Sequence, residues 1–437
     1  MLTGKAFFIH TRSFKGGRKL RVCVIGMGYI GFPTACIIAG AGHDVTGVDV
    51  NQETVSLLKN GGLHIENEKG LYELNKKVMQ SGKLNVQSTP EKADIFIIAV
   101  PTPCRKSAVG EAKKADLSYV EKASNDILPY LQKGNLVVLE STVPPGTTED
   151  VVGPILERGG FKFGQDIQLA FAPERVLPGR IMIELTSNDR IIGGVTREAA
   201  EKVRDFYATF VSGKIHLCNA RTAEMAKLIE NTYRDVNIAL ANELALLAEK
   251  AGVNSYEAID LANNHPRVNV LKPGPGVGGH CIAEDPYFLI EISNELSPLL
   301  QLARRINMGM PLHVVKLFQI FDEKYDIKKV SILGASYKAN VGDARNSPGL
   351  QVAEGIRAQG KEVVIHDPYI KEYRHELVEV LSGSDLMIIT TDHDYYREKL
   401  KPEEVGAIMN NKLAIDTRGF LDENWDKHFK VVRLGVG

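Results

Sequence analysis

Short apolar runs, each followed by a turn and an amphipathic stretch, dominate the first half of the chain. The run at 21–25 leads into a glycine turn and then into the apolar stretch 35–41, which predicts a strand, a turn and a helix. Further apolar runs at 94–100 and 136–140 are typical of buried parallel strands, because helices cover both faces of such a sheet. The pattern therefore predicts an α/β domain around a doubly wound sheet.

A long helical pattern follows between 220 and 252. We expect one helix of roughly 30 residues and about 45 Å, since an α-helix rises about 1.5 Å per residue. Such a helix is long enough to connect two domains and to offer a dimer surface. Its apolar face comprises Met225, Leu228, Ile229, Thr232, Val236, Ala239 and Leu240.

The strand pattern then restarts at 329–334, 362–367 and 384–390, in the same order as in the first half. This second copy repeats the architecture but lacks the glycine motif of the first copy, and a lysine, Lys338, stands in its turn, which suits a phosphate ligand. The predicted fold class is α/β, with two Rossmann-like doubly wound domains joined by a long central helix. We expect the reacting centre between the two domains.

A chain of 437 residues is too long for one ordinary core. The patterns predict a Rossmann-like domain and, after a central helical domain with a cysteine loop, a second Rossmann-like domain. A loose extension precedes them. The predicted bounds are 1–19 for the extension, 20–218 for the first domain, 219–310 for the central domain and 311–437 for the last.

Charge is nearly balanced, with 53 Lys and Arg against 54 Asp and Glu, so nothing favours a nucleic acid or an anionic membrane as partner. The apolar stretch within 1–19 is too short for a signal peptide or a membrane span. The cysteines are odd in number and lack metal-ligand spacing, so we expect a reducing cytoplasm, no disulfide and no bound metal. They are Cys23, Cys36, Cys104, Cys218 and Cys281.

A dinucleotide fingerprint follows the first strand. Gly26 permits a tight turn, Gly28 lets a pyrophosphate approach the helix N-terminus, and Gly31 lets helix and strand pack closely. Asp49 ends the second strand at the expected spacing and would accept hydrogen bonds from the adenosine ribose. Because no arginine follows it, NAD is favoured over NADP. The cofactor residues predicted in the turn are Gly26, Gly28, Tyr29, Ile30 and Gly31.

Two further turns follow apolar strands and would line the cofactor cleft, because ligands collect at the carboxyl ends of parallel strands. One contains Pro101 and Thr102, and the other contains Ser141 and Thr142. A plain strand-ending turn remains the alternative for each of them.

The loop 272–285 contains four glycines and two prolines around Cys281, a composition that can expose a thiol and bring backbone close to a ligand. Cys281 is therefore a candidate nucleophile, although a cysteine is more often a small buried apolar residue. Asp285 follows it by four residues, either as a functional carboxylate or as an ordinary helix cap. Lys227 and Asn231 share one helix face, either as functional groups or as a solvated surface.

Seven motifs in one order make the chain resemble the UDP-sugar 6-dehydrogenases, the UDP-glucose/UDP-mannose dehydrogenase family, over nearly its whole length from Arg21. The segment 264–269 resembles the branch that acts on UDP-N-acetyl-D-mannosamine. Glu284 stands where glucose-type enzymes carry a lysine, which favours a substrate other than UDP-glucose. The motifs are GMGYIG at 26–31, AVPTP at 99–103, STVPPGTT at 141–148, FAPERVLPG at 171–179, EMAKLIENTYRDVNIALANELA at 224–245, GPGVGGHCIAEDP at 274–286 and GASYKANVGDARNSP at 334–348.

The resemblance implies oxidation of the C6 alcohol of UDP-N-acetyl-D-mannosamine to a carboxylate with two NAD. Cys281 as thiolate would attack the intermediate aldehyde, and the resulting thiohemiacetal would be oxidised to a thioester that water hydrolyses. Lys227 would stabilise the oxyanion and assist proton transfer, with Asn231 on the same helix face. Glu174 would activate water, and Asp285 would orient the base or the water.

The resemblance also implies a UDP-sugar substrate. The long helix favours a homodimer or higher homo-oligomer over a monomer. Arg345 could meet the dinucleotide or a partner subunit, and His280 has a structural or substrate role. Each basic residue implied at the substrate site could also be a surface charge. The implied substrate residues are Glu174, Arg175, Lys227, Asn231, His265, Arg267, Gly278, Lys338 and Arg418.

Three alternatives stay open. The enzyme could carry out the same reaction on UDP-N-acetylglucosamine or UDP-glucose. The chain could be a non-catalytic protein that binds NAD or a nucleotide sugar. It could also be a two-electron alcohol dehydrogenase, which would release one NADH per sugar and an aldehyde.

Overall fold

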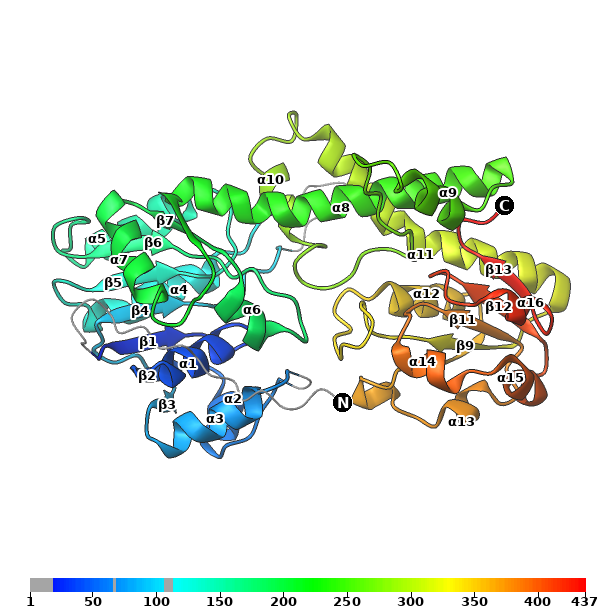
Figure 1. The fold of residues 1–437 in the computed structure, drawn as a ribbon, viewed down its shortest axis with the longest axis horizontal. Helices are drawn as coiled ribbons and strands as arrows, with labels where there is room; N and C mark the ends of the chain where they lie inside the picture. The colour runs from blue at the N-terminus through cyan, green and yellow to red at the C-terminus, as the bar shows by residue number, and fades with distance from the viewer. Residues whose placement is uncertain (1–18, 66–67, 106–112) are drawn as a thin grey trace. The chain divides into compact units, whose positions relative to one another are not determined.

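The computed structural model describes residues 19–65, 68–105 and 113–437 (Figure 1). All of the predicted extension except Lys19 lies outside these residues. The chain divides into two compact units. Unit 1 comprises Met1–Ile229 and Tyr287–Ile292, and unit 2 comprises Glu230–Pro286 and Ser293–Gly437. Residues 219–310 are shared between the units, and the division into three domains stays a prediction.

Unit 1 is built on an eight-stranded sheet in the order β3-β2-β1-β4-β5-β6-β7-β8. The strands β1 to β6 are parallel and adopt the order of a dinucleotide-binding fold. β7 runs antiparallel to β6, and β8 runs parallel to β7. The bounds are β1 Arg21–Ile25, β2 Asp44–Val48, β3 Leu84–Gln87, β4 Ile95–Ile98, β5 Leu136–Leu139, β6 Gln168–Phe171, β7 Arg190–Gly194 and β8 Ile215–Asn219.

Helices cover both faces of this sheet, so alternate residues of one strand enter different cores. In β1, Val22 and Val24 belong to one apolar cluster, while Cys23 and Ile25 belong to another. This explains why the strand is apolar at successive positions. The helices of unit 1 are α1 Gly31–Gly40, α2 Gln52–Lys59, α3 Leu71–Gln80, α4 Ser118–Ile127, α5 Gly153–Arg158, α6 Ile181–Ser187 and α7 Arg197–Tyr207, with a 3-10 turn at Leu128–Tyr130 and a π-helical turn at Thr148–Val152.

The predicted long helix is confirmed as α8, Ala220–Ala251, which ends one residue before the predicted bound. Gly252 follows with a φ of 71°, a conformation in which glycine commonly ends a helix. α8 continues without a break from unit 1 into unit 2. Three further helices follow it, namely α9 Ser255–Ala262, α10 Asp285–Ile290 and α11 Pro298–Tyr325.

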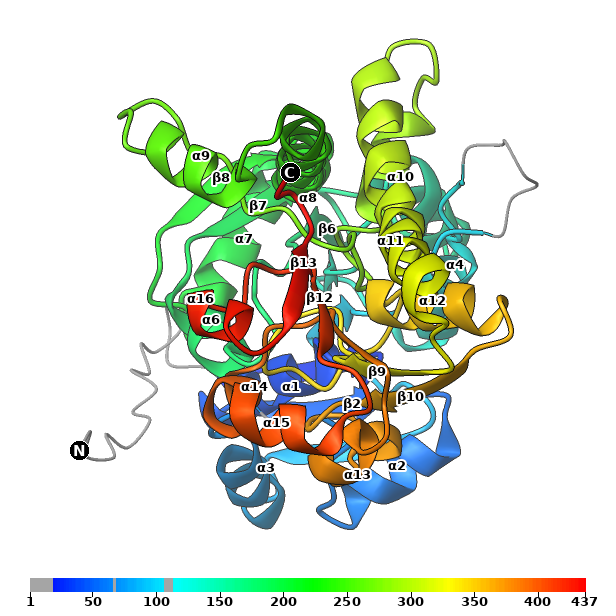
Figure 2. The ribbon, with the colours of Figure 1, turned by 90° about the vertical axis from the view of Figure 1, so that its right-hand side faces the viewer.

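Unit 2 contains a five-stranded parallel sheet in the order β10-β9-β11-β12-β13, a second doubly wound order. Helices α11 and α12 cover one face of this sheet, and α13 to α16 cover the other (Figure 2). Their side chains belong to two separate apolar clusters. The two Rossmann-like sheets predicted from the apolar runs are thus present. The bounds are β9 Lys329–Leu333, β10 Glu362–His366, β11 Leu386–Ile389, β12 Leu413–Asp416, β13 Lys430–Arg433, α12 Pro348–Arg357, α13 Leu377–Leu381, α14 Asp394–Lys399, α15 Pro402–Ile408 and α16 Glu423–Asp426, with a 3-10 turn at Lys371–Tyr373.

Candidate functional site

The glycine turn between β1 and α1 leaves no room for side chains at two of its positions. A Cβ on Gly26, whose φ is 97°, would lie 2.5 Å from the Ala99 carbonyl oxygen, and a Cβ on Gly31 would lie 1.9 Å from the Gly26 carbonyl oxygen. A Cβ on Gly28, in contrast, would meet no atom of the described residues within 4 Å. Gly28 therefore faces open space, as a glycine that admits a pyrophosphate should.

The N-terminus of α1 and the carboxylate of Asp49 complete a surface that fits NAD. No described side chain caps α1 at Ile30, and its first turn carries no acidic residue, so its N–H groups can bind an anion. Asp49 accepts hydrogen bonds from the Met27 and Asn51 N–H groups, both at 2.9 Å. Its carboxylate is only partly buried, so further lone pairs can accept ribose hydroxyls.

The two turns after β4 and β5 are tied to each other. The Thr102 hydroxyl donates to the Thr142 carbonyl oxygen at 2.6 Å, and the Ser141 hydroxyl donates to the Val100 carbonyl oxygen at 2.7 Å. Pro101 is exposed. The hydroxyls thus fix the turns, and contact of these residues with a cofactor stays a prediction.

Glu68 is a functional candidate that the sequence did not reveal. Its carboxylate accepts a hydrogen bond from the Tyr29 hydroxyl at 3.1 Å and others from the Gly179 and Ile181 N–H groups. It therefore joins the glycine turn to the end of the segment 171–179. Because Glu68 belongs to no motif and its partners are far away in sequence, no local pattern could have identified it.

Glu174 and Lys227 form a buried ion pair in unit 1. The Lys227 Nζ lies 3.0 Å from the Glu174 Oε1 and donates to the Glu174 carbonyl oxygen at 2.7 Å, while the Val176 N–H donates to Oε2 at 3.0 Å. Burial alone would raise the pKa of Glu174, but the charge and hydrogen bond of Lys227 outweigh it and lower the pKa. Glu174 is therefore a carboxylate at neutral pH and can accept a proton.

Glu224, one turn before Lys227 on α8, fixes the loop that follows β5. Its buried carboxylate accepts hydrogen bonds from the Gly146 N–H, the Thr148 N–H at 2.8 Å and the Thr148 hydroxyl at 2.6 Å. The first turns of α8 thus hold both the 141–148 loop and Glu174. The spacing of three residues between Glu224 and Lys227 was the available signal for this role.

In unit 2 the glycine loop presents the cysteine as predicted. Cys281 is exposed, whereas Cys23 and Cys36 are buried. Gly276 and Gly279 have φ values of 131° and 85°, which side chains rarely adopt.

A Cβ on Gly278 would lie 2.6 Å from the Cβ of Tyr337, and a Cβ on Gly279 would lie 2.9 Å from the Tyr337 ring. The glycines therefore allow the loop to pack closely on this tyrosine.

A helical turn links Cys281 to Asp285 at the start of α10. The Cys281 carbonyl oxygen accepts hydrogen bonds from the Glu284 N–H at 3.0 Å and the Asp285 N–H at 2.8 Å. The buried Asp285 carboxylate accepts from the Asn231 side-chain amide at 2.6 Å. This contact brings the two residues together as parts of one polar group, whose catalytic role stays a prediction.

Arg345 and Asn346 hold the other side of the cysteine loop. The Gly279 N–H donates to the Arg345 carbonyl oxygen at 2.8 Å, and the Asn346 amide donates to the Gly279 carbonyl oxygen at 3.1 Å and to Glu284 at 3.3 Å. The Arg345 guanidinium pairs with Asp343 at 2.6 Å. Burial and the nearby Arg345 charge lower the pKa of His280, so His280 is neutral at pH 7.

The remaining predicted substrate residues differ in their surroundings. Arg175 donates to the Asp189 carbonyl oxygen at 2.9 Å. Arg418 pairs with Asp392 at 3.2 Å, and a Cβ on Gly274 at the start of the cysteine loop would lie 2.4 Å from the Arg418 Nη1. Lys338 is partly buried in the turn after β9, and two further predicted residues, His265 and Arg267, are exposed after α9.

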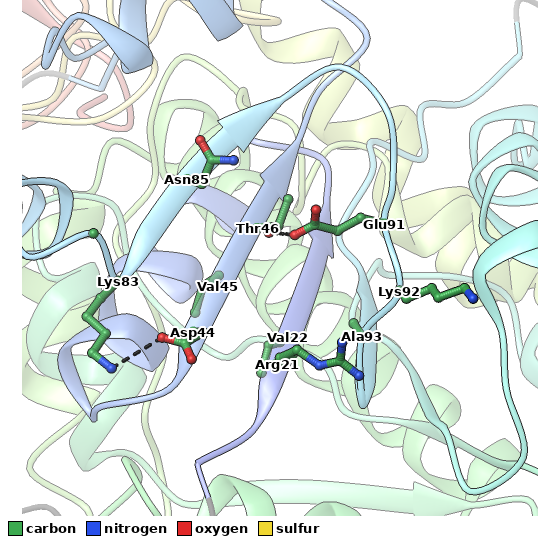
Figure 3. Close-up of a pocket in the computed structure, with 11 residues that line it drawn as sticks. Arg21, Val22, Asp44, Val45, Thr46, Lys83, Asn85, Glu91, Lys92 and Ala93 are labelled. Atoms are coloured by element: carbon green, nitrogen blue, oxygen red, sulfur yellow. Dashed lines mark hydrogen bonds and ion pairs between the residues drawn. The ribbon is translucent and has the colours of Figure 1, made fainter.

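A polar pocket lies at the amino-terminal ends of β1, β2 and β3, on the sheet edge opposite the glycine turn (Figure 3). Arg21, Asp44, Lys83 and Glu91 are among its lining residues, and Lys83 pairs with Asp44 at 3.2 Å. We assign it no role, because none of the predicted site residues lines it.

Across the described ranges, no cluster of three or more His, Cys, Asp or Glu side chains could hold a metal ion. The same ranges contain no helix that is long and apolar enough to cross a membrane.

Three family models match consecutive parts of the chain. The NAD binding domain of the UDP-glucose/GDP-mannose dehydrogenase family matches residues 20–211, its central domain matches 221–308, and its UDP binding domain matches 331–423.

Individual proteins match over nearly the whole chain. The UDP-N-acetyl-D-mannosamine dehydrogenase of Methanocaldococcus jannaschii is 48% identical over 434 residues, which cover 98% of this chain and 99% of that protein. The solved structure of the UDP-D-ManNAc dehydrogenase from Pyrococcus horikoshii superposes with a TM-score of 0.89 at 43% identity, covering 95% of this chain and 99% of that one. A UDP-glucose dehydrogenase structure from Pyrobaculum islandicum gives a TM-score of 0.83 at 28% identity, covering 97% and 99%.

Proposed function

The chain belongs to the UDP-glucose/GDP-mannose dehydrogenase family, and from that premise we propose that it oxidises UDP-N-acetyl-D-mannosamine at C6 to UDP-N-acetyl-D-mannosaminuronate. Members of this family are NAD-dependent oxidoreductases that act on nucleotide sugars. We choose this sugar because the chain is 48% identical to a UDP-N-acetyl-D-mannosamine dehydrogenase over 98% of its length. The alcohol, two NAD and one water give the carboxylate, two NADH and three protons.

Cys281 is the proposed nucleophile. When bound, NAD would supply the hydride acceptor for each of the two oxidations. Between them the Cys281 sulfur adds to the aldehyde carbon as a thiolate, and the carbonyl oxygen takes up a proton to give a thiohemiacetal. The second oxidation leaves a thioester, and water then breaks its carbon–sulfur bond to release the carboxylate and the thiolate. The exposure of Cys281 supports this assignment.

We assign charge stabilisation to Lys227 and water activation to Glu174. The buried Lys227 ammonium would stabilise the oxyanion that forms at the sugar carbon. Glu174 is ionised and could take a proton from the water that attacks the thioester. Asn231 and Asp285, which are hydrogen-bonded to each other, would orient the water or the base.

The cofactor and substrate assignments follow from the two Rossmann-like sheets. In unit 1 the glycine turn and Asp49 would bind NAD, with the turns at 101–102 and 141–142 beside it. Arg345 would meet the dinucleotide or the partner subunit. In unit 2 we assign UDP-sugar contacts to Gly278, Lys338, Arg418, His265, Arg267 and Asn231. In unit 1 we assign them to Glu174, Arg175 and Lys227. The UDP binding domain matched at 331–423 supports this placement for Lys338 and Arg418.

Counting NADH released per sugar tests the proposal. Purified protein is incubated with NAD and, separately, UDP-N-acetylmannosamine, UDP-N-acetylglucosamine and UDP-glucose, and products are identified by mass spectrometry. We expect two NADH and a carboxylate with the mannosamine sugar alone. Two NADH per molecule of another sugar would make that sugar the assigned substrate. One NADH per sugar would indicate a two-electron alcohol dehydrogenase, and no NADH would favour a binding protein.

The cysteine mechanism is tested by Cys281→Ser. We expect the variant to bind NAD and the UDP-sugar with unchanged affinity and to form no carboxylate, because a serine hydroxyl is a far weaker nucleophile than a thiolate. Cys218→Ser is the matched control and should keep wild-type turnover. Carboxylate formation by Cys281→Ser at the wild-type rate would contradict the mechanism.

We further propose a cytoplasmic homodimer that pairs through α8. An apolar stripe on this helix is exposed in the single chain, with residues spaced by three, four or seven positions so that they share a face. Because these side chains are 36% to 60% exposed, burying the remainder would stabilise a dimer by roughly 0.5 to 2 kcal/mol each. The stripe comprises Met225, Ile229, Tyr233, Leu240, Leu244 and Leu247.

The mass of the protein in solution tests the dimer. Light scattering after gel filtration should give twice the chain mass for the wild type and the single chain mass for Leu240→Glu combined with Leu244→Glu. Val378→Glu, an exposed apolar position on α13, is the control and should remain a dimer. A monomeric wild type would rule out the proposal.

A further inference from the structure

A buried polar network adjoins Glu174 in unit 1. Because β7 runs antiparallel to β6, its first residue, Arg190, lies at the sheet edge where β5 and β6 end. Glu140 directly follows β5, and Pro173 and Glu174 follow β6. One antiparallel strand thus brings a cation to the edge where the glycine turn and the candidate base are found.

The contacts of Arg190 link these residues. Its Nη1 donates to the Pro173 carbonyl oxygen at 2.9 Å, one residue before Glu174. Its guanidinium carbon lies 5.6 Å from the centroid of the Tyr207 ring, a cation–π distance. The Tyr207 hydroxyl in turn donates to the Glu140 Oε1 at 2.8 Å. Arg190 is 2% exposed, Glu140 1% and Tyr207 0%.

This network costs folding free energy. The Nε and Nη2 of Arg190 and the Oε2 of Glu140 have no hydrogen-bond partner among the described residues. Buried charges that are incompletely hydrogen-bonded are unfavourable, and apolar side chains of similar volume are often equally or more stable in their place. A gain in folding free energy therefore does not explain the buried arginine next to the Pro173–Glu174 turn. A role in the functional site does explain it.

We propose that Arg190 is a positioning residue for the reaction: it fixes the Pro173–Glu174 turn through the Pro173 carbonyl oxygen and, with Lys227, keeps the Glu174 side chain ionised. This inference rests on the proposed role of Glu174. The charged groups near Glu174 come from three elements, namely Lys227 on α8, Arg190 on β7 and Glu140 after β5.

The electrostatics agree with this geometry. Burial acts to raise the pKa of Glu174, and Lys227, the Val176 N–H and Arg190 act against it, so that the pKa is lowered. Burial raises the pKa of Glu140, and Arg190 opposes that rise. Removing the Arg190 charge should therefore make the Glu174 carboxylate easier to protonate.

Direct titration of the Glu174 carboxyl group tests the inference without turnover. Protein labelled with ¹³C at glutamate carboxyl carbons is titrated by NMR, and the Glu174 signal is assigned by its absence in Glu174→Gln. In Arg190→Gln, which removes the charge but keeps an amide donor for Pro173, we expect the Glu174 midpoint to move to higher pH. The acid limb of the kcat profile should move by the same amount. NAD and UDP affinities should stay within about twofold, as expected when the ligand sites are intact.

Two variants complete the design. Arg190→Lys keeps the charge and should return both midpoints to within a few tenths of a pH unit of wild type. Arg197→Gln removes an exposed cation from α7, the helix that carries Tyr207, and should change nothing. If Arg190→Gln does not fold, Arg190→Lys still tests the inference. This variant keeps the positive charge, so a shift of its Glu174 midpoint by a full pH unit would contradict the inference.

An unmoved Glu174 midpoint in folded Arg190→Gln would overturn the inference. A fall in NAD affinity together with kcat, while the acid limb stayed in place, would overturn it as well, since that would indicate a structural role only. Failure of the proposed role of Glu174 would look different, because Glu174→Gln would then keep wild-type turnover while the NMR titration still responded to Arg190. Failure of the proposed function would leave the wild type without NADH formation on any of the three sugars, and the NMR titration could still be measured.

Discussion

The two Rossmann-like sheets each carry an aspartate after their second strand, but the two carboxylates are held differently. Asp49 in unit 1 is partly exposed and accepts hydrogen bonds from two backbone N–H groups. Asp367 in unit 2 is fully buried, and its Oδ2 accepts from the Ala335 and Ser336 N–H groups, the Ser336 hydroxyl and the His393 Nε2. The first carboxylate can still accept from a ligand, whereas the second is satisfied within the protein.

This difference shows that one topology can serve two purposes. In unit 1 the aspartate keeps acceptor capacity for the ribose hydroxyls that we propose it binds. In unit 2 the equivalent aspartate stabilises the turn after β9, so a nucleotide there must be recognised by other groups, for which Lys338 and Arg418 are our candidates. The turns follow the same division. A Cβ on Gly28 meets open space, whereas the matching position of unit 2, two residues after Gly334, is Ser336, whose hydroxyl donates to Asp367.

The largest expected effect comes from Asp367→Asn. Burial acts to raise the pKa of Asp367, but His393 and Ser336 outweigh it and lower the pKa. Replacing the carboxylate by an amide removes its charge and one of its two acceptor oxygens, so at least one buried donor loses its partner. The free energy of unfolding, measured by urea unfolding, should fall by about 3 kcal/mol or more. NAD affinity should stay within about twofold. A variant with wild-type stability and weakened NAD binding would contradict this assignment, because Asp367 would then act on cofactor binding and not on the fold.

The same variant has a defined pH dependence. Because the folded pKa of Asp367 lies below its unfolded value near about 3.9, its stabilising contribution is complete at neutral pH. The contribution declines as the pH falls below about 4 and is lost once the folded carboxylate is protonated. Unfolding curves of wild type and Asp367→Asn should therefore converge in acid. A difference in stability that stays constant down to about pH 2 would contradict this assignment.

The next effect in size is that of Asp49→Asn. Loss of a charged acceptor for the ribose hydroxyls should weaken NAD binding by about ten- to a hundredfold, or about 1.4 to 2.8 kcal/mol, and should reduce discrimination against NADP. Calorimetric titration with both cofactors measures this, and UDP affinity should not change. If NAD affinity and NADP discrimination both survive the substitution, Asp49 does not bind the ribose.

The smallest effect is expected from Gly28→Ala. The added methyl group meets open space, so the free energy of unfolding should change by less than about 1 kcal/mol, while NAD affinity falls several-fold because the methyl group occupies the approach of the pyrophosphate. Gly309→Ala is a matched control within α11, where the added Cβ also meets no described atom within 4 Å. It should leave NAD affinity unchanged. Equal NAD affinities of Gly28→Ala and Gly309→Ala would mean that Gly28 does not belong to the cofactor site.

Local patterns predicted the buried parallel strands well, because such strands are apolar at successive positions. β1, β5 and β10 lie within one residue of their predicted bounds. The direction of β7 was not predictable, because it depends on which neighbour the strand pairs with and not on its own residues.

The site was predicted only in part for a related reason. Composition indicated the exposure of Cys281, which depends on its own loop. Glu68, Glu140 and Arg190 act through partners that are distant in sequence, such as the 111 positions between Glu68 and Gly179. A single charged residue outside any recognised motif carries no local mark of such a partner.

The continuity of α8 limits how this protein can change in evolution. Lys227 and Asn231 lie one turn apart on a helix that has no break between them. Inserting or deleting one residue between these positions would rotate everything that follows by about 100° relative to what precedes. Asn231 would then leave the helix face that it shares with Lys227. Surface loops of the two units can gain or lose residues, whereas an insertion or deletion within this turn of α8 would separate Lys227 from Asn231.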